Sequence, residues 1–207
     1  MPRAPLLAID ALRPSPRKVA QVVDVLRQGG VVAYPTDTVY GLGCGLTQRK
    51  AIDRIYRIKG LDRGHLLSFI CADLSNVSRY AVVNDSAYRW LRKLLPGPYT
   101  IILEATREVP RLLVEKRRTV GIRIPAHPLC QALVRELGEP LISTSAAGPD
   151  GEVLLDGHDI QERLGTQVDL IVESGAADAI PSTVLSLLND RMDVIREGKG
   201  PVDGVVR

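Results

Sequence analysis

The chain has 207 residues, of which 45% are hydrophobic and 25% charged, a composition typical of a folded globular protein. This composition excludes a disordered chain, a collagen-like fibre or a heptad rod as the main body, and the length predicts a single domain over residues 1–207. The net charge of +3 is too small to indicate a nucleic-acid-binding protein by itself.

No apolar run approaches the ~20 residues that span a bilayer, and the N-terminus carries Asp10 within its apolar stretch, so we expect neither a membrane span nor a signal peptide. Cys44, Cys71 and Cys130 are odd in number, widely spaced and embedded in apolar segments. We therefore expect reduced, buried thiols in a cytoplasmic protein, with no metal cluster and no membrane contact. Because the chain ends at Arg207, we also expect no additional regulatory domain.

Strand and helix signals alternate along the first half of the chain. Short apolar runs closed by proline or glycine are typical of buried strands, and apolar residues spaced i, i+3, i+4 and i+7 are typical of helices. Asn84 precedes one such helical pattern, and Pro96-Gly97-Pro98 stops it. These patterns predict strands at 31–34, 66–71 and 99–105, and helices at 51–58 and 84–95.

The second half continues the alternation. Pro128 opens a helix that runs through Leu137 and stops at Gly138. The run 141–142 leads into a loop of small residues, and a short helix is predicted at 159–164. Further strands are predicted at 119–124, 168–172, 183–188 and 193–196.

Two pairs of predicted strands have connections too short for a helical crossover: 99–105 with 119–124, and 183–188 with 193–196. These strands should be antiparallel neighbours. The sequence therefore predicts a mixed sheet of the α/β (α+β) class, and a purely parallel doubly wound fold is disfavoured.

The common nucleotide-binding and nucleophile motifs are missing. There is no GxxxxGK[ST] segment and no GxSxG elbow. The glycines at 41, 43 and 45 alternate without the GxGxxG spacing, and no histidine shares a local pattern with a nucleophile or a metal ligand. We therefore expect a structural role for each of the three histidines, His65, His127 and His158.

Two other segments can hold a ligand. Pro35–Gly43 places two threonines, an aspartate and flexible glycines beyond a buried strand, where they can line a pocket for a small polar ligand; alternatively, they satisfy their own backbone in a turn. Lys116, Arg117 and Arg118 run into the strand at 119–124, where an anionic ligand can sit; the alternative is a solvated loop.

A series of motifs over about residues 15–200 resembles the YrdC/YciO family. In chain order they are PTDTVYGLG at 35–43, IKG at 58–60, PGPYTIIL at 96–103, VGIRIPAHP at 120–128, PLISTSA at 140–146, PSTVLSL at 181–187 and IREGKG at 195–200. The resemblance implies a twisted open mixed sheet, flanked by helices, with a concave basic cavity. It also implies threonylcarbamoyl-AMP synthesis from L-threonine, bicarbonate and ATP, with magnesium assisting and pyrophosphate released, for tRNA modification.

The resemblance assigns roles to residues that match the family motifs. Thr38 and Arg123 correspond to the partners of the threonine hydroxyl and carboxylate, and Ser143 and Ser182 help to line that pocket. A guanidinium suits this task because it can grip a carboxylate with two parallel hydrogen bonds. The residues assigned to ATP binding are Lys59, Thr119, Ser145 and Arg196. Of these, Lys59 and Arg196 would neutralise the negative charge that the reacting anions bring together.

Three departures from the synthase pattern are similar to the YciO branch. Leu61 stands where synthases have an arginine, Ala147 where they have an asparagine, and Ile70 where they often have a histidine. A slower synthase or an enzyme that takes another amino acid or carboxylate is one interpretation. A second interpretation is a double-stranded RNA or tRNA-binding protein without synthase activity. It would contact the RNA backbone, because aromatic residues that could stack on bases make up only 4% of the chain. A third is a family member with neither activity.

Overall fold

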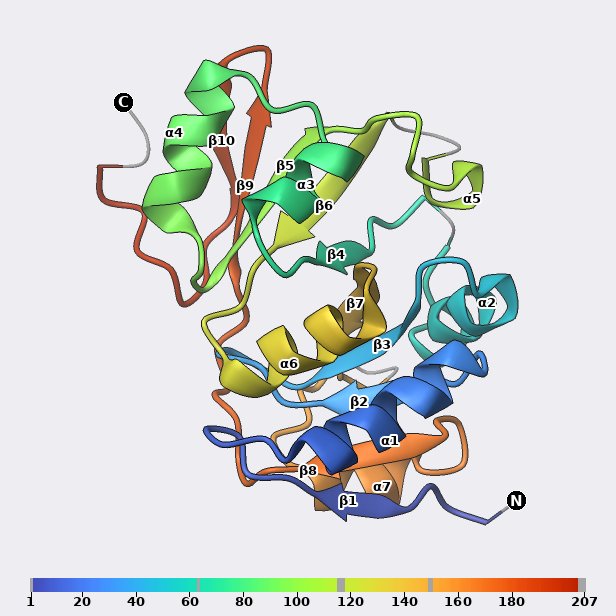
Figure 1. The fold of residues 1–207 in the computed structure, drawn as a ribbon. Helices are drawn as coiled ribbons and strands as arrows, with labels where there is room; N and C mark the ends of the chain where they lie inside the picture. Colours follow the sequence, from blue (N-terminus) through green and yellow to red (C-terminus); the bar gives the residue numbers. More distant parts are fainter. Residues whose placement is uncertain (1, 63, 115–117, 149–150, 205–207) are drawn as a thin grey trace.

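Within the described residues, 2–62, 64–114, 118–148 and 151–204 of a computed structural model, ten strands form one open mixed sheet (Figure 1). This confirms the expected fold class. The strand order is β1-β8-β2-β3-β7-β4-β6-β5-β9-β10. The strands are β1 (Leu6–Ala8), β2 (Val32–Tyr34), β3 (Gly41–Gly45), β4 (Ser68–Ile70), β5 (Tyr99–Glu104), β6 (Thr119–Arg123), β7 (Leu141–Ser145), β8 (Leu170–Glu173), β9 (Thr183–Leu188) and β10 (Arg191–Arg196).

The two predicted antiparallel pairs are confirmed: β5 pairs with β6, and β9 pairs with β10. The two hairpins join through a parallel pairing of β5 with β9. Parallel pairs also link β4 to β6, and β8 to both β1 and β2. The sheet is therefore mixed along its whole width.

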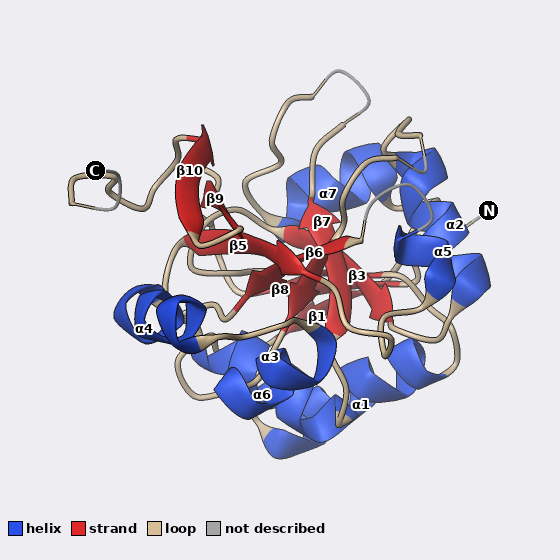
Figure 2. Cartoon of the chain, turned by 90° about the horizontal axis from the view of Figure 1, so that it is seen from above, coloured by secondary structure: helices blue, strands red, loops and turns tan. Residues whose placement is uncertain are grey.

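Seven helices surround the sheet in the described part of the chain, and α1, α3, α4 and α6 lie along one side of it when it is seen from above (Figure 2). The asparagine at 84 caps α4, since its side chain accepts from the Ala87 amide at 2.8 Å, and Gly138 ends α6 with φ 79°. The helices are α1 (Pro16–Arg27), α2 (Arg49–Ile58), α3 (Leu74–Tyr80), α4 (Asp85–Leu94), α5 (Arg111–Val114), α6 (Pro128–Leu137) and α7 (Gly157–Leu164).

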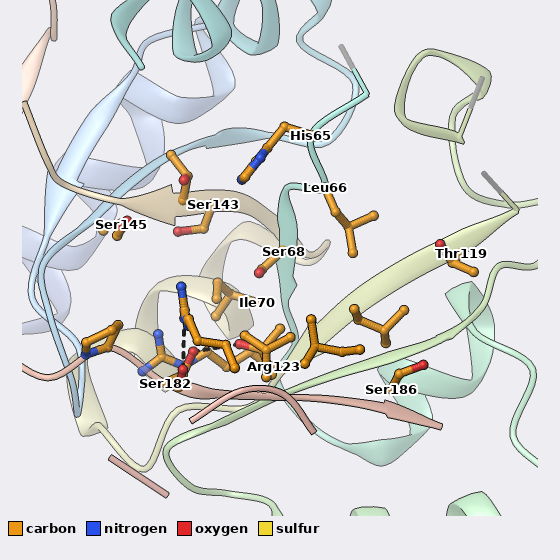
Figure 3. A pocket seen from close by; sticks show the side chains of 18 of the residues that line it. His65, Leu66, Ser68, Ile70, Thr119, Arg123, Ser143, Ser145, Ser182 and Ser186 are labelled. Atoms are coloured by element: carbon orange, nitrogen blue, oxygen red, sulfur yellow. Dashed lines mark hydrogen bonds between the residues drawn. The ribbon is translucent and has the colours of Figure 1, made fainter. Parts of the chain in front are cut away.

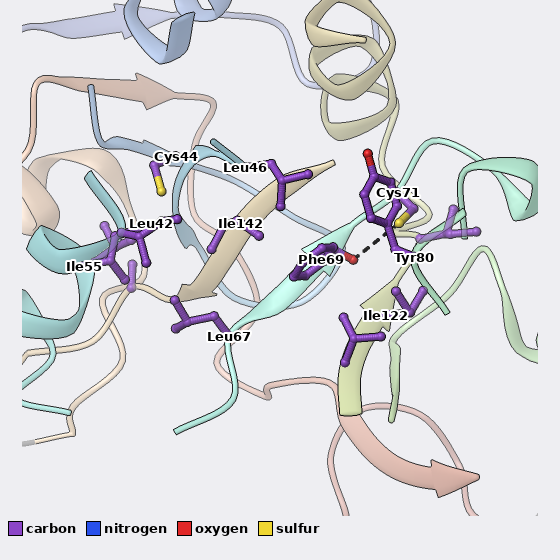
Figure 4. Packing of buried hydrophobic residues seen from close by; sticks show 14 of the residues in the cluster. Leu42, Cys44, Leu46, Ile55, Leu67, Phe69, Cys71, Tyr80, Ile122 and Ile142 are labelled. Carbon is purple, nitrogen blue, oxygen red and sulfur yellow. Dashed lines mark hydrogen bonds between the residues drawn. The ribbon is translucent and has the colours of Figure 1, made fainter. Parts of the chain in front are cut away.

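One face of the central strands carries large apolar side chains. Ile142, Phe69 and Ile122 are aligned in register across β7, β4 and β6, and all are buried in the main core, where Phe69 also packs on the Tyr80 ring of α3 (Figure 4). The opposite face of the same strands carries small or polar residues at Ser143, Ser68 and Gly121, again in register. This side-chain alternation gives the sheet one packed face and one face with room for a cavity.

The sequence predicts a loop after residue 142, which is wrong, and a turn over 35–43, which ends before Gly41. Gly41–Gly45 forms β3, which pairs with β2 on one side and β7 on the other, and β7 continues through Ser145. The glycines are needed for space, because a Cβ at Gly43 would lie 2.8 Å from the Tyr34 ring. The sequence reading also omitted β1, α1, α3 and α5.

All three cysteines are buried and free of disulfides, as expected. Across the described residues, no helix has the length and apolarity needed to cross a membrane.

Candidate functional site

A cavity of about 960 Å³ opens on the small-residue face of the sheet (Figure 3). Its walls come from β3, β4, β5, β6, β7, β9 and β10. Of the eight residues assigned by resemblance, six lie on these walls: Arg123, Ser143, Ser182, Thr119, Ser145 and Arg196. The fold therefore gathers residues that are up to 77 positions apart, from Thr119 to Arg196, around one space.

Arg123, the last residue of β6, is only 7% exposed. Its Nη2 donates to Thr36 Oγ1 at 3.1 Å, to Asp37 Oδ1 at 2.5 Å and to Thr38 Oγ1 at 2.7 Å, so the segment after β2 fixes this side of the guanidinium. Among the described residues, no group accepts a hydrogen bond from the buried Nε of Arg123. The Nε–H group of Arg123 therefore has no protein acceptor in the described chain.

Thr38 contacts this arginine from outside the cavity wall. It is fully buried and does not belong to the cavity wall, whereas Thr36 does. Thr36 Oγ1 donates to Val39 O at 2.7 Å and accepts from the Thr38 amide at 3.1 Å, which makes 36–39 a tight turn. The turn interpretation of this segment is confirmed, and Thr36 of the same segment also lines the cavity; a ligand there stays a prediction.

Ser143 and Ser182 face the cavity, and a buried hydroxyl group contacts each of them. The Tyr34 hydroxyl donates to Ser143 Oγ at 2.6 Å, and Thr100 Oγ1 lies 2.9 Å from Ser182 Oγ. The sequence reading did not include Tyr34 or Thr100 in the site. Only the strand pairing brings each next to its serine, so no local motif signals them.

Arg196 lies beside a bulge in β10. The pairing with β9 shifts register between Val194 and Arg196, and as a result both Ile195 and Arg196 line the cavity although they are consecutive. Arg196 Nη2 donates to Ser182 O at 2.8 Å. Burial, and secondarily the charge of Arg123, lowers the pKa of Arg196, although an arginine remains a cation at neutral pH.

Thr119 and Ser145 lie at opposite ends of the cavity (Figure 3). Lys59 follows α2 and is not part of the described cavity wall; its Nζ donates to Ala147 O at 3.3 Å. Arg118 lines the cavity, while Lys116 and Arg117 of the predicted cation cluster lie outside the described residues.

The three histidines have different environments. His65 lies on the cavity wall, and its structural role stays a prediction (Figure 3). His127 precedes α6, and burial lowers its pKa; the carboxylate of Asp37 opposes this shift. His158 is exposed in the first turn of α7. No group of three or more potential metal ligands occurs in the part of the chain that the structure describes.

Apolar side chains complete the cavity. Leu66 lies on the side of Thr119, whereas Ile70 lies closer to Arg123 (Figure 3). The apolar lining residues include Leu66, Ile70, Ile102, Val184, Leu188 and Ile195.

Comparison with known proteins identifies relatives over nearly the whole chain. The family model for Sua5, YciO and YrdC proteins, described as telomere recombination, matches residues 24–198. The uncharacterized protein YciO of Escherichia coli K12 is 46% identical over 191 residues, which cover 91% of this chain and 93% of that protein. A threonylcarbamoyl-AMP synthase of Vibrio vulnificus is 37% identical over 155 residues, covering 73% of this chain and 83% of the synthase.

A solved structure also matches. The crystal structure of P. abyssi Sua5 complexed with L-threonine superposes with a TM-score of 0.91 at 25% identity. The match covers 98% of this chain and 60% of that chain.

Proposed function

This chain belongs to the Sua5/YciO/YrdC family, and we propose that its cavity binds a small amino acid together with ATP and forms a carbamoyl adenylate. The proposed reaction is that of a threonylcarbamoyl-AMP synthase, for tRNA modification. The amine of L-threonine attacks bicarbonate and water leaves, giving a carbamate; a carbamate oxygen then attacks the α-phosphorus of ATP, and pyrophosphate leaves. A relative at 37% identity carries the name of this enzyme.

The setting of Arg123 is the observation that carries this proposal. Its guanidinium is buried, its Nη2 donates to three acceptors, and its Nε has no partner among the described residues. A planar cation held in this way suits a carboxylate, which can accept from two N–H groups at once. Ser143 and Ser182 add hydroxyl groups around the same position. L-threonine is the ligand named for the P. abyssi Sua5 structure.

ATP would occupy the remainder of the cavity, and magnesium would arrive with its phosphates as part of the substrate. Arg196, Thr119 and Ser145 lie on the walls as donors, and Arg196 adds the positive charge that phosphoryl transfer requires. The apolar residues of the cavity lining suit the purine base. Lys59 would need to redirect its Nζ from Ala147 O to reach a phosphate.

A small ligand is favoured over an RNA duplex. Arg123 is buried in the cavity wall with 7% of its surface exposed, whereas recognition of duplex RNA needs cations on a broad face that phosphates can reach. This argument concerns the cavity, where the family resemblance places the ligands.

The experiment is calorimetric titration of the purified protein with L-threonine and with ATP, followed by measurement of pyrophosphate release in the presence of bicarbonate. We expect Arg123→Lys to weaken L-threonine binding at least about tenfold, because lysine cannot form the paired contact. Arg191→Lys is the matched control, since its side chain is 80% exposed on β10. If the wild-type protein neither binds L-threonine nor releases pyrophosphate with it, the proposed reaction is wrong.

A further inference from the structure

The contact between Tyr34 and Ser143 joins the core to the cavity. Tyr34 ends β2 and is buried, while Ser143 lies on the cavity wall in β7, one strand beyond β3. Their hydroxyl oxygens lie 2.6 Å apart although the two residues are 109 positions apart in the chain. The tyrosine ring must therefore pass across β3 to reach the serine.

The glycines of β3 make this contact possible. A Cβ on Gly41 would lie 3.0 Å from Ser143 Oγ and 3.1 Å from Tyr34 Oη, and a Cβ on Gly43 would lie 2.8 Å from the Tyr34 ring. Real side chains rarely approach so closely, so residues larger than glycine at these positions would displace the ring. The alternation of glycines in YGLGCG is thus matched to a tyrosine that reaches across this strand.

The direction of the hydrogen bond follows from the two environments. Within the described chain, Tyr34 has no other acceptor for its single hydroxyl proton, and burial raises the pKa of Tyr34 well above its usual value, so the proton stays on the phenol. If Ser143 were the donor, the Tyr34 proton would remain buried without an acceptor. Tyr34 therefore donates, and the Ser143 proton points elsewhere. The open side of Ser143 is the cavity.

We propose that Tyr34 is a positioning residue that fixes Ser143 as a hydrogen-bond donor directed into the cavity. Ser143 Oγ is already an acceptor for Tyr34, so it presents its proton to a ligand oxygen. In terms of the proposed function, on which this step rests, Ser143 and Arg123 then act together as donors that select a carboxylate over an amine or an ammonium group.

The first test needs no ligand. Ser143→Ala leaves the buried Tyr34 proton without an acceptor, whereas Tyr34→Phe leaves a serine hydroxyl that can bond to cavity water. We expect Ser143→Ala to lower the melting temperature by about 5 °C and Tyr34→Phe by less. The double variant should melt higher than Ser143→Ala alone, because the unpaired donor is gone. A double variant that melts no higher than Ser143→Ala would overturn the assigned direction.

The second test uses L-threonine as the probe. Tyr34→Phe should raise its dissociation constant about three- to tenfold, and adding Tyr34→Phe to Ser143→Ala should have no further effect, because Tyr34 acts through the serine. Tyr99→Phe is the matched control: this buried tyrosine donates to Pro201 O at 2.9 Å, outside the cavity wall, so its loss should affect stability alone. Equal, additive effects of Tyr34→Phe in both backgrounds would contradict the proposal. If the wild-type protein does not bind L-threonine, the proposed function fails, and the melting order still decides the role of Tyr34.

Discussion

The carboxylate of Asp37 lies 2.5 Å from the guanidinium of Arg123, and both side chains are about nine-tenths buried, with 11% and 9% exposed. The second oxygen of Asp37 accepts from the Ala126 amide at 3.0 Å, while its backbone carbonyl accepts from Lys199 Nζ at 2.7 Å. One aspartate thus ties together the segment after β2, the end of β6 and the segment after β10. It holds Arg123 at the position where a carboxylate ligand is proposed to bind.

Removing the charge of Asp37 should therefore affect both stability and ligand binding. We expect Asp37→Asn to lower the free energy of unfolding by about 3 kcal/mol, because a buried cation loses its counter-charge. L-threonine should also bind more weakly, since the guanidinium is no longer fixed. Urea unfolding and calorimetry on the same preparation measure both effects. The control is Asp193→Asn, from an ion pair with Arg191 whose side chains are 46% and 80% exposed, for which we expect almost no change. Equal effects of the two substitutions would contradict a special role for the buried pair.

The nucleotide assignment predicts a loss of ATP affinity in two variants. Arg196→Ala and Lys59→Ala should each weaken binding by roughly 1–3 kcal/mol, the scale of a charged hydrogen bond to a phosphate. Titration with magnesium-ATP measures the loss, and Arg191→Ala on the same strand as Arg196 controls for net charge. Unchanged affinity in both variants would remove the nucleotide assignment.

The strand pattern of this fold was largely predictable because local signals were strong. Pro96-Gly97-Pro98 ends one helix before β5, and Pro128 with Gly138 bounds α6 at the predicted residues. Helix α1 carries a comparable signal that the sequence reading overlooked: its buried residues Val19, Val22, Val23 and Leu26 have helical spacing. Valine favours strands by propensity, and packing against α6 outweighs that preference.

The arrangement of the site was much less predictable, because it depends on strand register. The glycines of 35–43 indicate a flexible turn, yet from Gly41 onwards the chain forms β3, which is paired on both sides. Gly41 and Gly43 leave space for the Tyr34 ring. His65 carries no local motif and reaches the cavity only through the tertiary structure, in which Tyr56 donates to its carbonyl at 3.0 Å. The family resemblance predicted Arg123 as a site residue, whereas its three hydrogen-bond acceptors are seen only in the tertiary structure.

Acidification should destabilise the protein partly through His127. Burial lowers the pKa of His127 below its usual 6.5 in the folded state, so the unfolded chain binds more protons between the two values. The stability contributed by neutral His127 is therefore present above pH ~6.5 and is lost as the pH falls from 6.5 towards the folded pKa. Unfolding measured from pH 7.5 to 5.5 should show a smaller loss for His127→Gln than for the wild-type protein. His158→Gln is the control because His158 is exposed. Identical slopes for wild type and His127→Gln would contradict this assignment.

The last prediction concerns the two departures from the synthase pattern. Leu61 is partly buried against the main core in the segment that follows Lys59, and Ala147 is only 3% exposed, bridged to Val153. With these residues in place of an arginine and an asparagine, threonine-dependent pyrophosphate release should be slow but measurable, since Arg123 and Arg196 still position the reactants. Leu61→Arg should raise the rate about tenfold, because it adds a cation near Lys59.

Ala147→Asn should behave differently, because its site is filled. The larger polar side chain must enter a buried position, which typically costs about 1–3 kcal/mol, so the double variant with Leu61→Arg should melt lower than Leu61→Arg alone. Leu12→Arg adds the same charge at a residue that is 78% exposed and absent from the cavity wall. It should change neither the rate of pyrophosphate release nor the melting temperature. Pyrophosphate release and melting temperature measured on the same samples separate lost folding from lost chemistry. If a stable Leu61→Arg variant releases no more pyrophosphate with threonine than without it, threonine is not the substrate. Another carboxylate is then favoured.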